Sequence, residues 1–201
     1  PISEGEVLYD GVDIRQMKRK EVAKKAALLS QSRNTPSIQA IHMVLHGRFP
    51  YLSYPRSYTA EDKKIAKESM ARTGTSAYET ANVSELSGGQ RQGIYLAMAL
   101  AQDTSTVFMD GPSTYLDVKH QLQVMQTAKE LAKAGKAVVL VLHDLPMALA
   151  GADKIAVFEQ GALRACDTPE QIYAQGILDQ VFEVKVRCVE TADGRQYYCT
   201  M

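Results

Sequence analysis

Three short apolar runs mark the strands that this sequence predicts for its core, Ala26–Ser30, Thr106–Met109 and Ala137–Leu142. The last two are nearly free of polar residues, which is typical of parallel strands that are buried on both faces. Between them, Val118–Ala134 has helical periodicity and is followed by Gly135, a residue type that often ends helices. A strand, a helix and a strand at this spacing predict a right-handed βαβ unit in a mostly parallel sheet.

A helical segment, residues 36–102, separates the first strand from the other two. Apolar residues recur at helical spacing within Ser37–His46, and Gly47 follows in the position of a C-cap. A second helix is expected at Ala60–Thr73, and a third runs from the capped residues Ser87–Gln90 to about residue 102. We therefore expect a helical lobe that is inserted into an α/β core.

Turn signals and a charged stretch complete the expected elements. Two-residue turns predict hairpins, at Glu6–Ile14, at Ile155–Phe158 with Ala162–Ala165, and at Val184–Val189 with Gln196–Cys199. Thr168 and Pro169 open a capped helix, and the charged segment Arg19–Lys25 is interpreted as a helix with a solvated face.

Composition excludes some classes of protein. The 201 residues carry 23 Lys and Arg against 23 Asp and Glu, so the formal net charge is zero and no nucleic-acid partner is expected. Three scattered cysteines, Cys166, Cys188 and Cys199, lack C-x-x-C spacing and indicate reduced thiols. No apolar run approaches the roughly 20 residues that a membrane span requires.

The residues Leu86–Gln90, Leu-Ser-Gly-Gly-Gln, predict a helix start that can hold an anion. Ser87 as N-cap and Gln90 three positions later form a capping box. Because Gly88 and Gly89 lack side chains, an oxyanion can approach their N–H groups, and the helix dipole adds positive potential. On its own, such a stretch is also an ordinary capped helix. The anion-binding interpretation requires a tip that can be reached from outside the fold.

Two of the predicted strands end in chemically active side chains. Asp110 follows one strand, and His143 follows the other. Ligands of open α/β sheets bind at the carboxyl ends of strands, where a carboxylate commonly holds Mg²⁺ through water. Considered singly, Asp110 is more often a turn residue and His143 a helix cap. Their combination with the glycine-containing tip changes the interpretation.

In chain order, Gln31, Ser87–Gln90, Asp110, Asp117 and His143 form a series that resembles the ATP-hydrolysing subunits of ABC transporters. They match the Q-loop, the L-S-G-G-Q signature, the Walker B strand, the D-loop and the switch histidine of that family. Softer similarities indicate the subgroup that powers uptake of iron-siderophores, haem and cobalamin, and they lie at His46–Pro50, Leu116–Leu122 and Ile177–Tyr198.

The resemblance implies an α/β fold with a P-loop NTPase (RecA-like) core, a mostly parallel sheet and an inserted α-helical ABC subdomain, with the N-terminal strand, loop and helix missing. Four parts are expected. They are the truncated N-terminal part of the core (1–35), the helical signature subdomain (36–102), the core with Walker B and the switch histidine (103–165), and C-terminal helices with a small hairpin (166–201).

The resemblance also implies ATP and Mg²⁺ as cofactors. Two subunits would enclose two ATP molecules, and Ser87–Gln90 of one subunit would meet the γ-phosphate held by the other. Asp110 and Gln31 would hold Mg²⁺ through water, and Gln31 would also contact the attacking water. His143 would hydrogen-bond the γ-phosphate, and Asp117 would link the two sites.

The implied partners are a second copy or a paired ABC subunit, an integral membrane permease docked at the helical subdomain and, indirectly, a substrate-binding protein. The expected location is cytoplasmic, peripheral on the cytoplasmic face of the plasma membrane. Closing of the dimer would drive import of an iron-siderophore, haem or cobalamin-type ligand. Four aromatic residues are candidates for the groove that receives the permease, Phe49, Tyr51, Tyr54 and Tyr58.

Two departures from the family pattern qualify the expected activity. No G-x-x-x-x-G-K-[ST] motif is present, and the resemblance places this P-loop just before Pro1. A truncated chain is therefore expected, one that as given binds ATP poorly or not at all and is inactive. Gly111 stands where the family usually has a catalytic Glu, and loss of a general base typically costs about 10²–10⁴ in rate. Gly93 and Met98 occupy positions where the family often has Arg.

Two alternatives remain. A degenerate, non-hydrolysing ABC subunit could use Ser87–Gln90 to complete a partner's ATP site, and the presence or absence of an upstream P-loop distinguishes the two cases. An ABC ATPase that acts on DNA or the ribosome is disfavoured, because no heptad repeats separate Gln31 from Ser87 and the net charge is zero.

Overall fold

The computed structural model describes residues 4–30, 35–112, 117–192 and 194–201. The chain forms two compact units, residues 1–141 and residues 142–201, and each is described by itself. Within the described ranges, no helix is both long enough and apolar enough to cross a membrane.

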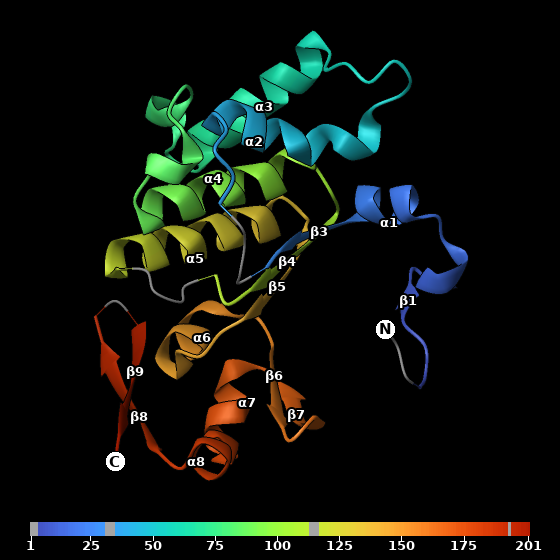
Figure 1. The fold of residues 1–201 in the computed structure, drawn as a ribbon. Helices are drawn as coiled ribbons and strands as arrows, with labels where there is room; N and C mark the ends of the chain where they lie inside the picture. Colours follow the sequence, from blue (N-terminus) through green and yellow to red (C-terminus); the bar gives the residue numbers. More distant parts are fainter. Residues whose placement is uncertain (1–3, 31–34, 113–116, 193) are drawn as a thin grey trace. The chain divides into compact units, whose positions relative to one another are not determined.

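The first unit is built on a three-stranded parallel sheet, ordered β3 (Ala26–Leu29), β4 (Thr106–Asp110) and β5 (Ala137–Val141). Alternate residues of β3 and β4 are buried, and those of β5 partly buried, beneath α4 (Gly88–Ala101) and α5 (Val118–Lys133), which cover one face of the sheet in Figure 1. The predicted strand–helix–strand unit is therefore confirmed as β4, α5 and β5, with the two strands parallel.

The opposite face of this sheet is partly exposed, so the prediction that the strands are buried on both faces is wrong for the described chain. Leu28, Phe108 and Val139 stand side by side in the register of the three strands, and all three are exposed. The exposed fraction of Leu28 is 62%. Side chains alternate between the two faces of a strand, and α4 and α5 cover only one of them.

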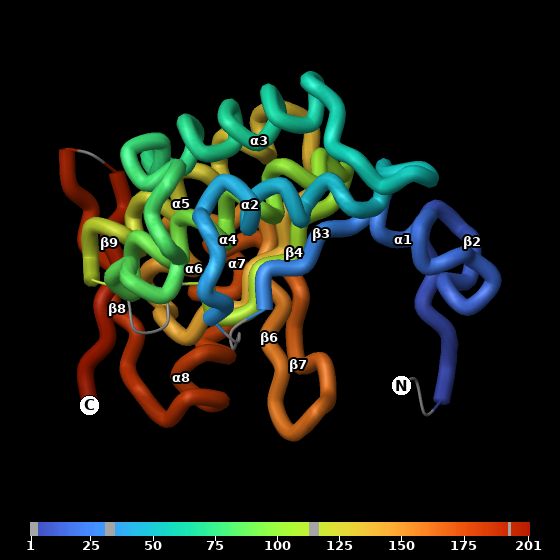
Figure 2. The backbone as a smooth tube through the Cα atoms, turned by 45° about the horizontal axis from the view of Figure 1, so that its top comes forward, coloured from blue at the N-terminus to red at the C-terminus, as the bar shows by residue number. Residues whose placement is uncertain are grey.

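The segment between β3 and β4 is helical, as predicted. Its elements are α2 (Ala40–Leu45), the 3₁₀ helix η2 (His46–Tyr51), α3 (Ala60–Arg72) and two further 3₁₀ turns, η3 (Ser76–Tyr78) and η4 (Val83–Glu85). Helices α2 and α3 both pack on α4, as the views in Figures 1 and 2 show. Thr59 caps α3 through a capping box with Asp62.

Gly47 does not act as the predicted C-cap. The cap of α2 is His46, and the chain continues directly into η2. A Cβ atom built on Gly47 would collide with the Met98 carbonyl oxygen of α4 and would lie 3.0 Å from the Gln102 nitrogen. The glycine is therefore needed for the close approach of two helical segments rather than for a turn.

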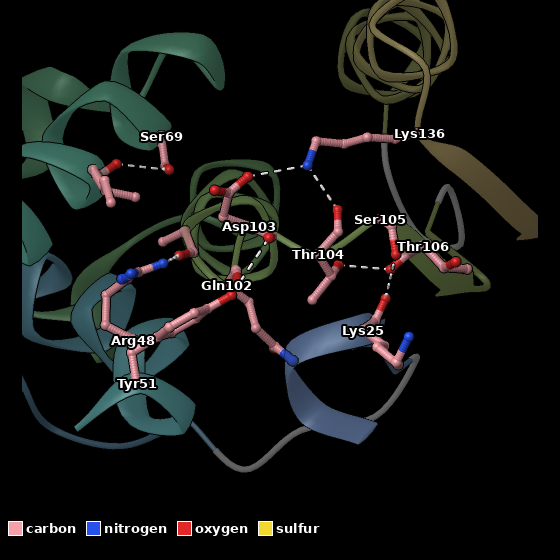
Figure 3. Close-up of polar contacts among 12 residues, drawn as sticks. Lys25, Arg48, Tyr51, Ser69, Gln102, Asp103, Thr104, Ser105, Thr106 and Lys136 are labelled. Carbon is pink, nitrogen blue, oxygen red and sulfur yellow. Dashed lines mark hydrogen bonds and ion pairs between the residues drawn. The ribbon is translucent and has the colours of Figure 1, made fainter. Parts of the chain in front are cut away.

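The residues after Gly47 close the C-terminal end of α4 (Figure 3). Arg48 is buried, donates from Nη1 to the Ala101 carbonyl over 2.9 Å, and lies 3.9 Å from the centroid of the Tyr51 ring. The Tyr51 hydroxyl donates to the Gln102 carbonyl over 2.9 Å. Of the four aromatic candidates for a permease groove, Tyr51 thus has a structural role within this unit.

The N-terminal hairpin consists of β1 (Leu8–Tyr9) and β2 (Val12–Asp13), followed by η1 (Ile14–Gln16) and α1 (Arg19–Lys25). The Tyr9 hydroxyl lies 2.7 Å from Ser105 Oγ and 2.8 Å from Thr106 Oγ1, at the start of β4. Lys136 donates to the Asp103 carboxylate and to the Thr104 carbonyl just before the same strand (Figure 3). These contacts fix the edge at which the parallel strands begin.

The second unit contains short helices and two antiparallel hairpins, β6 (Ile155–Glu159) with β7 (Ala162–Asp167) and β8 (Lys185–Thr191) with β9 (Gly194–Thr200). Both hairpins and the Thr168-capped helix α7 (Pro169–Ala174) were predicted. Helix α6 (Leu145–Gly151) was not predicted, and α8 (Ile177–Phe182) was expected only without bounds, among the C-terminal helices of residues 166–201. One small core holds these elements together, and it contains Leu149, Val157, Ile172, Leu178 and Val186.

Candidate functional site

The N-terminal tip of α4 has the predicted capping box. The Gln90 backbone N–H donates to Ser87 Oγ over 3.3 Å, and the Ser87 N–H donates to Gln90 Oε1 over 3.0 Å. This exchange satisfies two of the donors that a helix start leaves without an intrahelical acceptor. The remaining N–H groups of the first turn are directed outward along the helix axis.

This tip is open. Ser87 and Gly88 are exposed, and a Cβ atom built on Gly88 would meet no atom of the part of the chain that the structure describes within 4 Å. Helix α4 has 14 residues, about 21 Å, and its dipole places positive potential at the tip. Exposed N–H groups, a serine hydroxyl and room for an anion fit a phosphate oxygen.

Side chains from the first turns of α4 reach neighbouring elements and hold the tip in place. Gln90 Nε2 donates to the Tyr78 hydroxyl over 2.9 Å, and Gln92 Nε2 donates to the Pro112 carbonyl over 3.2 Å. Pro112 follows Gly111 directly, so Gln92 joins α4 to the segment after β4. Sequence reasoning missed both contacts, because each joins residues that are 12 or more positions apart.

Asp117 and His120 form the start of α5 and also contact the tip of α4. Asp117 is the N-cap, and its Oδ1 accepts the His120 backbone N–H over 2.9 Å and lies 2.7 Å from His120 Nδ1. These hydrogen bonds, the backbone bond above all, hold the pKa of the Asp117 carboxyl below its ordinary value. A Cβ atom on Gly89 would lie only 2.6–2.7 Å from three atoms of the His120 ring.

The contact between His120 and Gly89 brings two predicted site segments together, the signature residues and the D-loop aspartate. His120 itself was named only within the similarity at residues 116–122, without a role. The sequence did contain a signal for the contact between His120 and Asp117, namely their spacing, since a residue three positions after an N-cap can bond back to it.

Asp110 and Gly111 lie at the carboxyl end of β4. Asp110 is exposed and is paired in register with Val141 of β5. Gly111 is buried, has a φ of +54°, and donates its N–H to the Val141 carbonyl over 3.2 Å. An exposed strand-end carboxylate fits a role in holding Mg²⁺ through water. The described residues contain no cluster of three or more His, Cys, Asp or Glu that could hold a metal by itself.

Two further predicted site residues are His143 and Gln31. His143 is exposed and belongs to the second unit. It does not cap the helix that follows, because Asp144 Oδ1 accepts the Met147 N–H over 2.8 Å as the N-cap of α6. Gln31 lies outside the described residues.

The parallel sheet, the helical segment between its strands and the open, capped tip of α4 define an ATP-binding cassette. A solved dimeric structure of the ATP-binding cassette MJ0796, in a post-hydrolysis state bound to ADP and Pi, has the same fold. Its TM-score is 0.69 at 27% sequence identity, and the match covers 83% of this chain and 74% of that chain.

The chain belongs to the ABC transporter family, because the family model of that description matches residues 1–114. The petrobactin import ATP-binding protein FpuD of Bacillus anthracis is 33% identical over 183 residues, which are 90% of this chain and 67% of that protein. The iron(3+)-hydroxamate import ATP-binding protein FhuC of Bacillus subtilis is 36% identical over 187 residues, 92% of this chain and 70% of that protein. Membership implies ATP binding, and the relatives include ATP-binding proteins of siderophore import.

Proposed function

We propose that this protein is the ATP-binding and ATP-hydrolysing subunit of an ABC importer for iron-siderophore, haem or cobalamin-type ligands. The observation that carries the proposal is the open tip of α4, where Ser87 and Gly88 are exposed and no atom of the described residues lies within 4 Å of a Cβ atom built on Gly88. The identity to import ATP-binding proteins, FpuD and FhuC among them, supports the class of transported ligand.

In this proposal two copies bind ATP between them. The tip of α4 in one copy donates N–H and hydroxyl groups to the γ-phosphate of the nucleotide that the other copy holds. A similar cassette solved as a dimer bound to ADP and Pi supports a dimeric arrangement. Asp110 and Gln31 hold Mg²⁺ through water, and the ion neutralises phosphate charge when it is bound. His143 donates to the γ-phosphate, and Asp117 joins the two ATP sites.

The permease is proposed to dock on the helical segment, beside the aromatic residues of 49–58. Tyr54 is 97% exposed and Phe49 is exposed, so both are available to a partner. Tyr58 packs edge-on against Phe49 at a centroid distance of 6.3 Å, and Tyr51 is engaged at the end of α4. Docking therefore rests on Phe49 and Tyr54 rather than on all four aromatics.

A variant of the tip that keeps the helix start but changes its charge tests the proposal. Aspartate is as good an N-cap as serine, so Ser87→Asp preserves the start of α4 and places a negative charge against the phosphate. We expect the full-length protein with Ser87→Asp to bind ATP as a monomer with unchanged affinity but to lose ATP-dependent dimerisation, measured by analytical ultracentrifugation.

The matched control is Ser84→Asp, an exposed serine three positions upstream in η4, which should dimerise normally. ATP-dependent dimers of the Ser87→Asp protein at the wild-type ATP concentration would show that the tip does not grip the nucleotide.

A second candidate is a non-hydrolysing subunit that completes the ATP site of a partner. The observation that favours it is Gly111, which has no side chain to orient water after the Walker B aspartate. A full-length protein that dimerises with ATP but does not release phosphate would support this candidate over the first.

A further inference from the structure

We propose that His120 is a positioning residue that couples the phosphate-binding tip of α4 to Asp117, so that the two act on the partner's nucleotide as one unit. The inference deepens the proposed function and rests on it for its role in the dimer. The contact of His120 with both segments does not depend on the proposed function, because it follows from the distances in the structure.

The His120 ring bridges two helix starts. On one side Nδ1 lies 2.7 Å from Asp117 Oδ1, and the backbone N–H of His120 donates to the same oxygen over 2.9 Å. On the other side the ring lies against Gly89, which is the second residue of α4. The side chain of His120 is 30% exposed, whereas that of Asp117 is 67% exposed. The imidazole therefore lies between a helix tip and a carboxylate that faces solvent.

Gly88 and Gly89 lack a side chain for two different physical reasons. A Cβ atom on Gly88 would meet no described atom within 4 Å, so the lack of a side chain gives an anion access to the backbone. A side chain on Gly89 would overlap the His120 ring, since its Cβ would lie 2.6 Å from Cε1 and 2.7 Å from each ring nitrogen. Gly89 thus makes room for a neighbour within the same subunit.

This contact transmits position from one segment to the other. Among the described residues, His120 makes two hydrogen bonds to the Asp117 carboxylate, one from its backbone N–H and one from its ring, so the ring helps to orient this carboxylate. The ring cannot move toward α4, because it already lies against Gly89. A displacement of the tip toward the ring on phosphate binding therefore displaces the ring, and with it the aspartate that is proposed to join the two ATP sites.

A double-mutant cycle tests the contact without nucleotide. We expect Gly89→Ala to lower the thermal unfolding midpoint of the full-length protein by roughly 5 °C, because the methyl group overpacks against the ring. The combined Gly89→Ala/His120→Ala protein should unfold at the midpoint of His120→Ala alone, since removal of the ring relieves the overlap. Gly88→Ala, which adds the same methyl group in open space, serves as the stability control and should cause no loss.

A second measurement separates positioning from simple capping of α5. In the full-length protein we expect His120→Ala to leave the affinity of the monomer for ATP and the KM for ATP unchanged, while ATP-dependent dimerisation weakens about tenfold and kcat falls in parallel. His120→Gln, whose amide can still donate to Asp117, should recover most of both losses.

The outcomes are distinguishable. Additive unfolding shifts in the double-mutant cycle would overturn the contact between His120 and Gly89. Suppose instead that the unfolding shifts are non-additive, as expected, but His120→Ala keeps wild-type dimerisation and kcat. His120 would then only stabilise the start of α5, which would overturn the coupling and leave the proposed function intact. Normal dimerisation of Ser87→Asp would instead refute the proposed function, and the coupling with it.

Discussion

Arg48 and Asp62 form a buried ion pair, with Arg48 Nε donating to Asp62 Oδ1 over 2.9 Å and both side chains less than 10% exposed. Arg48 also donates to the Ala101 carbonyl at the end of α4, where a cation is favourable for the helix dipole. Asp62 in turn accepts the N–H and hydroxyl of Thr59 at the start of α3. The pair therefore fixes the C-terminal end of the same helix whose N-terminal tip is the candidate site.

Removal of one partner of this pair should be costly. In Asp62→Asn the positive charge of Arg48 stays buried without a counter-charge, and such a loss typically costs roughly 3–5 kcal/mol. We expect that decrease in the free energy of unfolding, measured by urea titration at pH 7. Glu61→Gln is the control, an exposed neighbour whose replacement should change the free energy by less than about 0.5 kcal/mol. Equal effects of the two substitutions would contradict the assigned role.

Acid should weaken the fold through the same carboxyl group. Burial by itself raises the pKa of Asp62, but hydrogen bonds from Arg48 and Thr59 outweigh burial and leave this pKa below its ordinary value of 3.8. A lowered pKa in the folded state adds stability that is fully present above 3.8 and is lost as the pH falls through the folded value. The stability difference between wild type and Asp62→Asn should therefore shrink below pH 3.8, as measured by urea titrations across the acid range. A constant difference would show that the charge of Asp62 does not contribute.

Gly47 provides a prediction about packing. In Gly47→Ala the new methyl group meets the backbone of α4 at Met98 and Gln102, which cannot move away as a flexible side chain could. We expect a loss of about 1–3 kcal/mol in the free energy of unfolding, or more if α2 and α4 separate. Gly88→Ala is the matched glycine with open space around it, and it should leave stability unchanged or slightly higher. If Gly47→Ala behaves like Gly88→Ala, the close approach does not constrain the fold.

At Gly111, a side chain should lower stability through backbone strain, whereas a glutamate should raise ATP turnover. Its φ of +54° is unfavourable for a side chain by about 1–2 kcal/mol, so both Gly111→Glu and Gly111→Gln should lower stability by similar amounts. Only the glutamate can polarise the attacking water, and we expect it to raise ATP turnover of the full-length protein by about 10²-fold or more. Phosphate-release assays on the two variants check this, and equal rates with Glu and Gln would refute the role assigned to this position.

Local patterns in the sequence predicted most of the helices and strands and the start of the candidate site. The capping box of Ser87 and Gln90 depends only on residues three positions apart, and the Asp10-Gly11 and Gln160-Gly161 turns are equally local. Helix α6 was missed because it has only seven residues, too few to show a helical pattern of apolar positions, and because it closely follows a strand. The four-part division of the chain and the roles of the predicted site residues stay predictions.

The sequence by itself determined that a glycine-containing helix tip follows a capping serine, that Asp110 ends one strand and that His143 lies shortly after another. It could not decide that Gly47 serves helix packing, that one face of the sheet is exposed, or that His120 lies between Gly89 and Asp117. These relationships depend on atoms that are brought together only when segments distant in the chain pack against each other, and no spacing along the chain encodes the distance between them.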